Sequence, residues 1–84
     1  MKKITKQEIK LYFVVAMKYK KTKDDTYAHV DAKKAMWAMM GGLEDKYTCE
    51  AVDFLDTLIS EAYYNHKSVE QVIAAYQAIG YEVE

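Results

Sequence analysis

Hydrophobic residues recur at three- and four-residue intervals in four stretches of the chain, which is the spacing of one face of an α-helix. In the first stretch the recurring positions are Ile9, Tyr12, Phe13, Ala16 and Met17. Glu8 follows Thr5 by three residues, as in a capping box, so a helix is predicted to begin after Thr5. The run Leu11–Met17 also fits a buried strand, but no second strand of matching length is predicted to pair with it. We therefore favour a helix.

The second predicted helix spans about residues 26–40. Its N-cap is Asp24, Asp25 or Thr26, because these side chains accept hydrogen bonds from the free backbone N–H groups of a first turn. Gly41-Gly42 is predicted to end this helix, since glycine adopts the left-handed terminating conformation without a side-chain clash.

The third predicted helix starts after Thr48 and runs to about Asn65, and it is the most clearly amphipathic segment. Its apolar face holds Val52, Leu55, Leu58, Ile59 and Ala62. Ser68 begins a second capping box and a fourth helix, which Gly80 ends. The alternating tail after Gly80 is expected to be extended, without an evident strand partner. These patterns predict an all-α fold, a compact bundle of about four short helices in one domain spanning residues 1–84.

Composition places the chain among globular proteins. Of its 84 residues, 51% are hydrophobic and 30% are charged, which favours a packed core over disorder. No apolar run approaches the ~20 residues of a membrane-spanning helix, so we expect no membrane association, and we predict no signal peptide. The single cysteine, Cys49, cannot form an intramolecular disulfide, which suits the reducing cytoplasm. Cys49 is expected to be a small buried hydrophobic residue, because no histidine lies near it in the sequence to activate it.

Charge is distributed unevenly along the chain. Residues 1–43 contain ten lysines and four acidic residues, whereas residues 44–84 contain two lysines and nine acidic residues. Arginine is absent, and arginine normally supplies the bidentate hydrogen bonds that read guanine or clamp phosphoryl groups. This argues against sequence-specific DNA binding and phosphoryl transfer. The two charged halves either lie side by side within the fold or form a dipolar surface that steers a partner.

The second predicted helix is the most unusual element, because its apolar arc is wider than packing on a single core requires. One face holds Ala28, Ala32, Ala35, Met36 and Met39, and the arc is extended by Val30, Trp37 and Met40, with Lys33 between them. Either the helix is central and buried on most sides, or Val30, Lys33, Trp37 and Met40 bind a partner. Tryptophan is enriched at binding hot spots, and methionine gives an adaptable surface. We predict partner binding, with homodimerisation as the simplest form and another protein as the next.

Nucleic-acid binding is the alternative function. The first predicted helix has a candidate basic face formed by Lys6, Lys10, Lys18 and Lys21. A basic groove with aromatic side chains can follow phosphates and stack bases. However, Tyr12 is expected in the core, and a net charge of −1 is not typical of a nucleic-acid-binding domain. The helices that flank Gly41-Gly42 could form a helix-turn-helix, but the outer face of the second one is acidic.

The third predicted helix carries a candidate acidic face formed by Glu50, Asp53 and Glu61. Carboxylates in a row can mimic phosphates, although a simply solvated face is the default. Neither His29 nor His66 has an acidic residue three positions earlier, so the Glu-x-x-His metal motif of helical bundles is absent. The sequence also lacks a glycine-rich phosphate loop. We expect no catalytic residue, no metal, no cofactor and no enzymatic activity.

Small, cysteine-poor domains rich in lysine and tyrosine resemble accessory proteins of phages and other mobile elements. Some of those proteins inhibit host defence enzymes, as anti-CRISPR proteins do. The resemblance is one of size and composition, and it implies an inhibitor that binds a host protein. The sequence thus predicts a cytoplasmic, non-catalytic protein-interaction module, with nucleic-acid binding through the first helix as the alternative.

Overall fold

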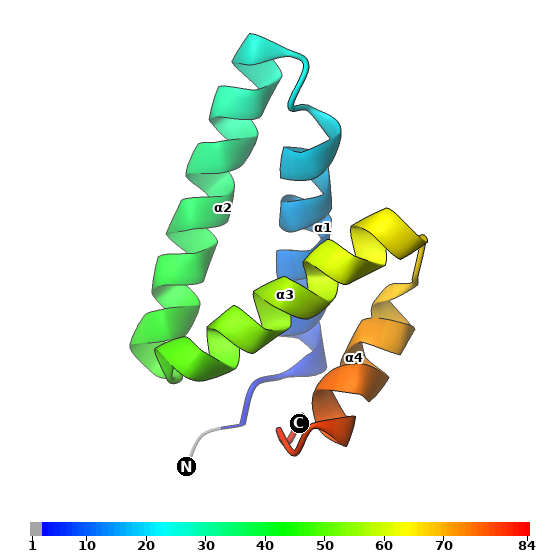
Figure 1. The fold of residues 1–84 in the computed structure, drawn as a ribbon. Coiled ribbons are helices and arrows are strands. Elements are labelled where there is room, and N and C mark those ends of the chain that lie inside the picture. The colour runs from blue at the N-terminus through cyan, green and yellow to red at the C-terminus, as the bar shows by residue number, and fades with distance from the viewer. Residues whose placement is uncertain (1–2) are drawn as a thin grey trace.

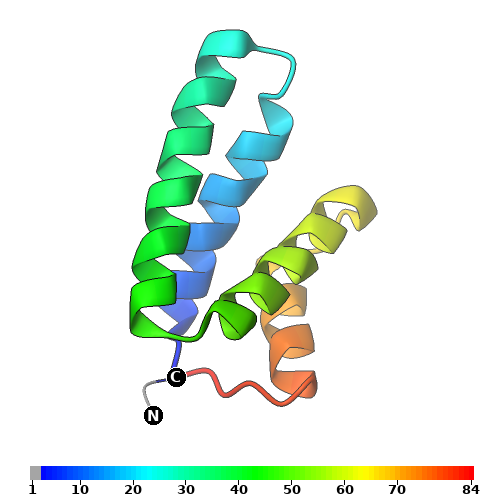
Figure 2. The ribbon, with the colours of Figure 1, turned by 60° about the vertical axis from the view of Figure 1, so that its left-hand side comes forward.

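The computed structural model describes residues 3–84 and contains four α-helices joined by short connections (Figure 1). The helices are α1 (Lys6–Lys21), α2 (Thr26–Lys46), α3 (Cys49–Asn65) and α4 (Val69–Ala78). α1 and α2 form an antiparallel hairpin, and α3 and α4 form a second pair that leans away from it (Figure 2). The prediction of an all-α bundle is confirmed. Within residues 3–84, no helix has both the length and the apolar character needed to cross a bilayer.

Side-chain caps determine where the helices begin. At the start of α1, the Glu8 N–H donates to Thr5 Oγ1 and the Thr5 N–H donates to Glu8 Oε1, so the predicted capping box is confirmed. Of the three N-cap residues predicted for the second helix, Asp25 is the one that caps α2. Thr48 and Ser68 cap α3 and α4, also as predicted. These starts are predictable because each depends only on residues within one turn of the cap.

The run Leu11–Met17 is helical throughout, which excludes the strand interpretation. Tyr12 and Ala16 are buried, whereas Leu11 and Val14 are exposed. This alternation at three- and four-residue steps lets α1 bury one face while its opposite face contacts solvent.

The prediction that Gly41-Gly42 ends the second helix is wrong, because α2 continues through both glycines to Lys46. A helical glycine is about 1 kcal/mol less favourable than alanine, but it does not stop a helix whose later residues have a packing partner. Leu43 is such a residue, since it is buried in the core and burial of a leucine contributes ~1.5–3 kcal/mol. The helix ends at Lys46, and the N–H of the C-cap residue Tyr47 donates to the Leu43 carbonyl. A helix-turn-helix around the glycines is therefore excluded.

The core is formed by side chains of all four helices. Its largest fully buried members are Tyr12, Tyr76, Ile9, Leu55, Ile59, Val52 and Val72. Both tyrosine hydroxyls have partners: Tyr12 donates to Asp56 Oδ1 at 2.7 Å, and Tyr76 donates to the Ala51 carbonyl at 3.0 Å. The two hydrogen bonds tie α1 and α4 to α3, so the tyrosines enter the core without leaving a polar atom unpaired.

The extended tail has a partner that the sequence pattern did not predict. Val83 and Ile4 form an isolated parallel β-bridge, and the Glu84 N–H donates to the Ile4 carbonyl at 2.8 Å. Gly80 turns the chain toward this bridge with a φ of 108°, a conformation that glycine adopts at little cost. The last residues of the chain therefore lie against the segment that precedes α1.

Cys49 is exposed, so the prediction that it is buried is wrong. It is the first residue of α3, and its thiol donates to Glu44 Oε2 at 3.6 Å. The negative charge of Glu44 and this hydrogen bond raise the pKa of the Cys49 thiol. The neutral thiol form is thereby favoured, which makes Cys49 a weak nucleophile.

Candidate functional site

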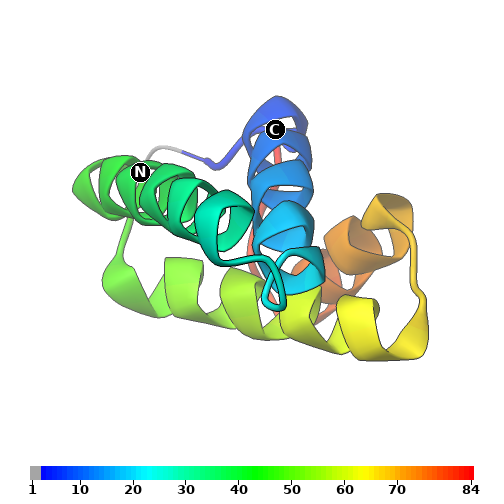
Figure 3. The same ribbon diagram turned by 90° about the horizontal axis from the view of Figure 1, so that it is seen from above.

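α2 lies at the edge of the bundle. α1 lies between α2 and α4, and α1 and α3 each contact all three other helices, whereas α2 contacts only α1 and α3 (Figure 3). Ala32 and Leu43 are the buried residues of α2, and Met36, Met39 and Met40 pack partly against the core. The interpretation of the second helix as a central one buried on most sides is therefore wrong.

The four predicted partner-binding residues differ in their exposure. Trp37 is 59% exposed and Val30 is 45% exposed. Lys33 is half-buried, and its Nζ lies 4.6 Å from the centre of the Trp37 ring, in a cation–π contact. Met40 packs partly against the core. Val30 and Trp37 are thus the accessible apolar surface, and Lys33 restrains the indole.

The side of α2 next to Trp37 presents small residues and two opposite charges. Ala38 and Gly41 are exposed, and a Cβ added to Gly41 would meet nothing within 4 Å. Lys34 and Asp45 are exposed and about three turns apart, which places them on the same side of the helix. We define the α2 outer face as Val30, Lys34, Trp37, Ala38, Gly41 and Asp45. Another helix could approach its backbone closely, because only Trp37 is bulky near the centre.

The other predicted surfaces are exposed but do not form enclosed sites. The acidic-face residues Glu50, Asp53 and Glu61 are exposed on α3, and none of them forms an ion pair within residues 3–84. The basic-face residues Lys6, Lys10, Lys18 and Lys21 are exposed along α1, and among them Lys21 lines a groove. Phosphate mimicry by the acidic face stays a prediction.

No family model, curated protein or solved structure matches this chain. The choice of a site therefore rests on the geometry of the chain. Within the described part of the chain, no three histidine, cysteine or acidic side chains gather closely enough to hold a metal ion.

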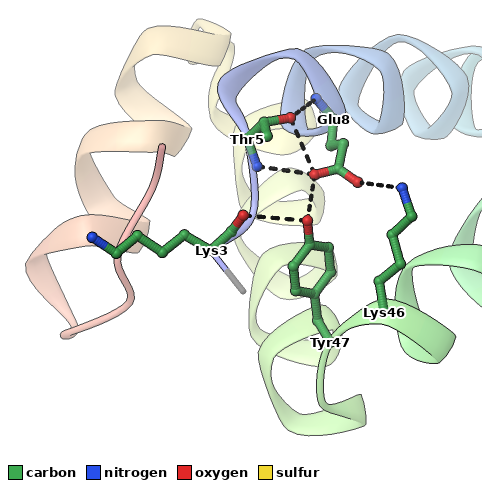
Figure 4. Close-up of polar contacts among 5 residues, drawn as sticks. All are labelled: Lys3, Thr5, Glu8, Lys46 and Tyr47. Carbon is green, nitrogen blue, oxygen red and sulfur yellow. Dashed lines mark hydrogen bonds and ion pairs between the residues drawn. The ribbon is translucent and has the colours of Figure 1, made fainter. Parts of the chain in front are cut away.

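The densest polar cluster joins the start of α1 to the end of α2 (Figure 4). Glu8 Oε1 accepts hydrogen bonds from the Thr5 N–H at 3.0 Å and from the Tyr47 hydroxyl at 2.6 Å. Glu8 Oε2 accepts from Lys46 Nζ at 3.3 Å. Burial raises the pKa of Glu8, but the bonds from Tyr47, Thr5 and Lys46 outweigh burial and leave this pKa lowered. The bond to Glu8 raises the pKa of Tyr47 to about 12. A carboxylate so stabilised is a poor general base, and we interpret the cluster as a clamp between α1 and α2.

A cavity of about 430 Å³ lies beside this clamp, between the N-terminal segment and the tail. Ile4, Tyr76 and Tyr81 give it a mainly apolar lining, and the Tyr76 and Tyr81 rings stack at 4.7 Å. The charged residues Lys3 and Glu82 at its rim pair with each other at 3.3 Å. The polar groups of this cavity are therefore engaged within the chain instead of pointing toward a ligand.

Replacing Glu8 by glutamine is expected to lower the free energy of unfolding by about 1 kcal/mol at neutral pH, because the charge-assisted bonds are lost. The folded pKa of Glu8 lies below its ordinary value of 4.5. The contribution of Glu8 to the free energy of unfolding is therefore complete above its ordinary pKa, and it is lost as the pH falls through the folded pKa. Urea unfolding at neutral and strongly acidic pH measures the effect, and the gap between wild type and Glu8→Gln should close in acid. Glu70→Gln, in the first turn of α4, is the matched control. A difference in stability between wild type and Glu8→Gln that does not change with pH would contradict the clamp.

A second accessible surface lies between the C-terminal ends of α1 and α3, and it was not predicted from the sequence. Its lining includes Phe13, Lys21, Lys23, Tyr63, Tyr64 and Lys67. The Tyr63-Tyr64 pair close to Lys67 is a signal visible in the sequence. Its proximity to the lysines that end α1 is not, because it depends on how α1 packs on α3.

Proposed function

We propose that this chain is a non-catalytic protein-interaction domain that self-associates through the α2 outer face. Trp37 carries the proposal, because an indole that is 59% exposed in the middle of an edge helix leaves most of its apolar surface in contact with solvent. Exposed Val30 lies two turns away on the same side and enlarges this surface. Contiguous exposed apolar residues mark interaction sites, and tryptophan is enriched at their centres.

Charge favours a second copy of the chain as the partner. In an antiparallel pair of α2 helices centred between Met39 and Met40, Lys34 of each copy lies level with Asp45 of the other. Two-fold symmetry then forms two attractive pairs. A parallel pair in register would instead place like charges together, which is unfavourable. The outer face is thus self-complementary in the antiparallel arrangement.

The same antiparallel register places Gly41-Gly42 at the contact between the two copies. Trp37 of one copy lies level with the two glycines of the other, where bare backbone leaves room for the indole. In the single chain, an added Cβ at either glycine meets nothing within 4 Å, so intramolecular packing does not require glycine there. Each glycine nevertheless costs the helix about 1 kcal/mol relative to alanine. Contact with a second copy would offset that cost.

Trp37→Ala is expected to weaken self-association by at least about tenfold, as truncation of a hot-spot aromatic does. Helix content should not change, because the side chain is mostly exposed. Sedimentation equilibrium over a concentration series measures association, and circular dichroism measures helix content. Tyr64→Ala is the matched control, since Tyr64 is also an exposed aromatic residue but lies on α3.

Exchange of charges tests the antiparallel register. Asp45→Lys alone should weaken association, and the double variant Lys34→Asp/Asp45→Lys should restore it. A wild-type chain that stays monomeric up to millimolar concentration would overturn self-association. Unchanged association of Trp37→Ala would move the contact away from α2. A host protein as the partner stays a prediction from composition, and Trp37→Ala should weaken that contact if it uses the same face.

A further inference from the structure

A groove of about 660 Å³ opens between the C-terminal ends of α1 and α3, away from the α2 outer face. Its accessible aromatic residues are Tyr63 and Tyr64, whose rings meet edge to face with their centres 5.2 Å apart. Tyr64 is 68% exposed, and Phe13 of α1 adds an apolar wall. The groove therefore offers the exposed ring of Tyr64 to a ligand.

The charges around this groove are positive. Lys21, Lys23 and Lys67 line it, and no aspartate or glutamate is among its lining residues. Lys20 adds a fourth ammonium group, with Nζ 6.0 Å from the ring centre of Tyr63 and 5.9 Å from that of Tyr64. Lysines in the last turn of α1 also complement the helix dipole. Lys67, however, lies in the connection after α3, so positive charge reaches the groove from two separate elements.

We propose that this groove binds a short stretch of single-stranded nucleic acid. The lysines would contact phosphates, and the exposed ring of Tyr64 would stack on a base, which is the combination that binds single strands. Lysine is a point charge without the bidentate geometry of arginine, so binding should depend little on base sequence. The volume lies within the ~300–1,000 Å³ range of small-ligand sites and suits a nucleotide or two of a longer strand.

This site differs from the basic face that the sequence predicts on α1. Of the four residues of that face, Lys21 alone lines the groove, while Lys6 and Lys10 lie at the other end of the helix. The inference is also independent of self-association, because no groove residue belongs to the α2 outer face. The two proposals can therefore fail separately.

Fluorescence anisotropy with a labelled twelve-nucleotide oligothymidylate tests the proposal on the full chain. Neutralising about three phosphates should make the affinity fall about 20-fold between 50 and 200 mM salt. Tyr64→Ala should weaken binding about tenfold, whereas Tyr64→Phe, which keeps the ring, should not. Lys67→Glu should weaken binding by a similar factor. Tyr27→Ala is the matched control and should bind like wild type, because Tyr27 is an exposed aromatic residue outside both the groove and the α2 outer face. Circular dichroism verifies that each variant is folded.

Several results would overturn the proposal. Absence of binding at low salt would refute it, as would equal affinity of the wild type and a folded Tyr64→Ala variant. If Lys10→Glu weakens binding as much as Lys67→Glu, the strand binds along the whole of α1 and not in the groove. Thymidine monophosphate that competes as well as the oligonucleotide would identify a free nucleotide as the ligand. A duplex that binds as tightly as the single strand would exclude base stacking.

Discussion

Leu55→Ala should lower the free energy of unfolding by about 3–5 kcal/mol. Leu55 is completely buried in the middle of α3, and loss of its side chain leaves a cavity in addition to the lost transfer free energy. A domain of this size has a total stability of roughly 5–15 kcal/mol, so the variant should lose a large part of it. The midpoint of thermal unfolding should fall by roughly 15 °C or more. Urea and thermal unfolding followed by circular dichroism measure both quantities.

Leu11→Ala is the matched control for this experiment. Leu11 is also a helical leucine, but it is 46% exposed in an open groove between α1 and α2, so its truncation should cost less than about 1 kcal/mol. Equal losses for the two variants would contradict the assignment of the α1 faces, and with it the position of the predicted basic face.

Alkaline pH should unfold the protein cooperatively. Tyr12 and Tyr76 are buried, and burial raises the pKa of both hydroxyls. The hydrogen bond to Asp56 raises the pKa of Tyr12 further. The pKa of Tyr76 rises to about 12 from an ordinary value of 10. A raised folded pKa means that stability is fully present below pH 10 and is lost as the pH rises. Each tyrosine should remove up to ~1.4 kcal/mol per pH unit, so the pair should remove about 5 kcal/mol by pH 12.

Tyrosinate absorbance and circular dichroism, recorded together from pH 9 to pH 12.5, test this expectation. The exposed tyrosines should ionise first while helix content stays constant, and Tyr47 and the buried pair should ionise together with the loss of helix. In Tyr76→Phe, the stability lost across this range should be smaller than in the wild type. Full ionisation of all eight tyrosines of a still helical wild-type chain would contradict the burial of Tyr12 and Tyr76.

The two proposed binding surfaces differ in how far the sequence could reveal them. Trp37 and Val30 are visible in the sequence, because helical periodicity places them outside a single apolar stripe. Periodicity alone does not show whether another helix covers them, and the structure answers this by leaving them exposed at the edge. The groove needs a contact between Lys20 and Tyr63, which lie on different helices, so no local pattern predicts it.

The all-α class follows from the periodicity of the hydrophobic residues. The helix starts at Thr5, Thr48 and Ser68 are also predictable from local sequence, because each depends on a hydrogen bond between residues three positions apart, which forms in the same way in many folds. The end of α2 depends on tertiary packing, because burial of Leu43 outweighs the cost of the glycines before it. The edge position of α2 and the pairing of the tail with Ile4 also depend on tertiary packing, since both rest on contacts between residues far apart in the chain.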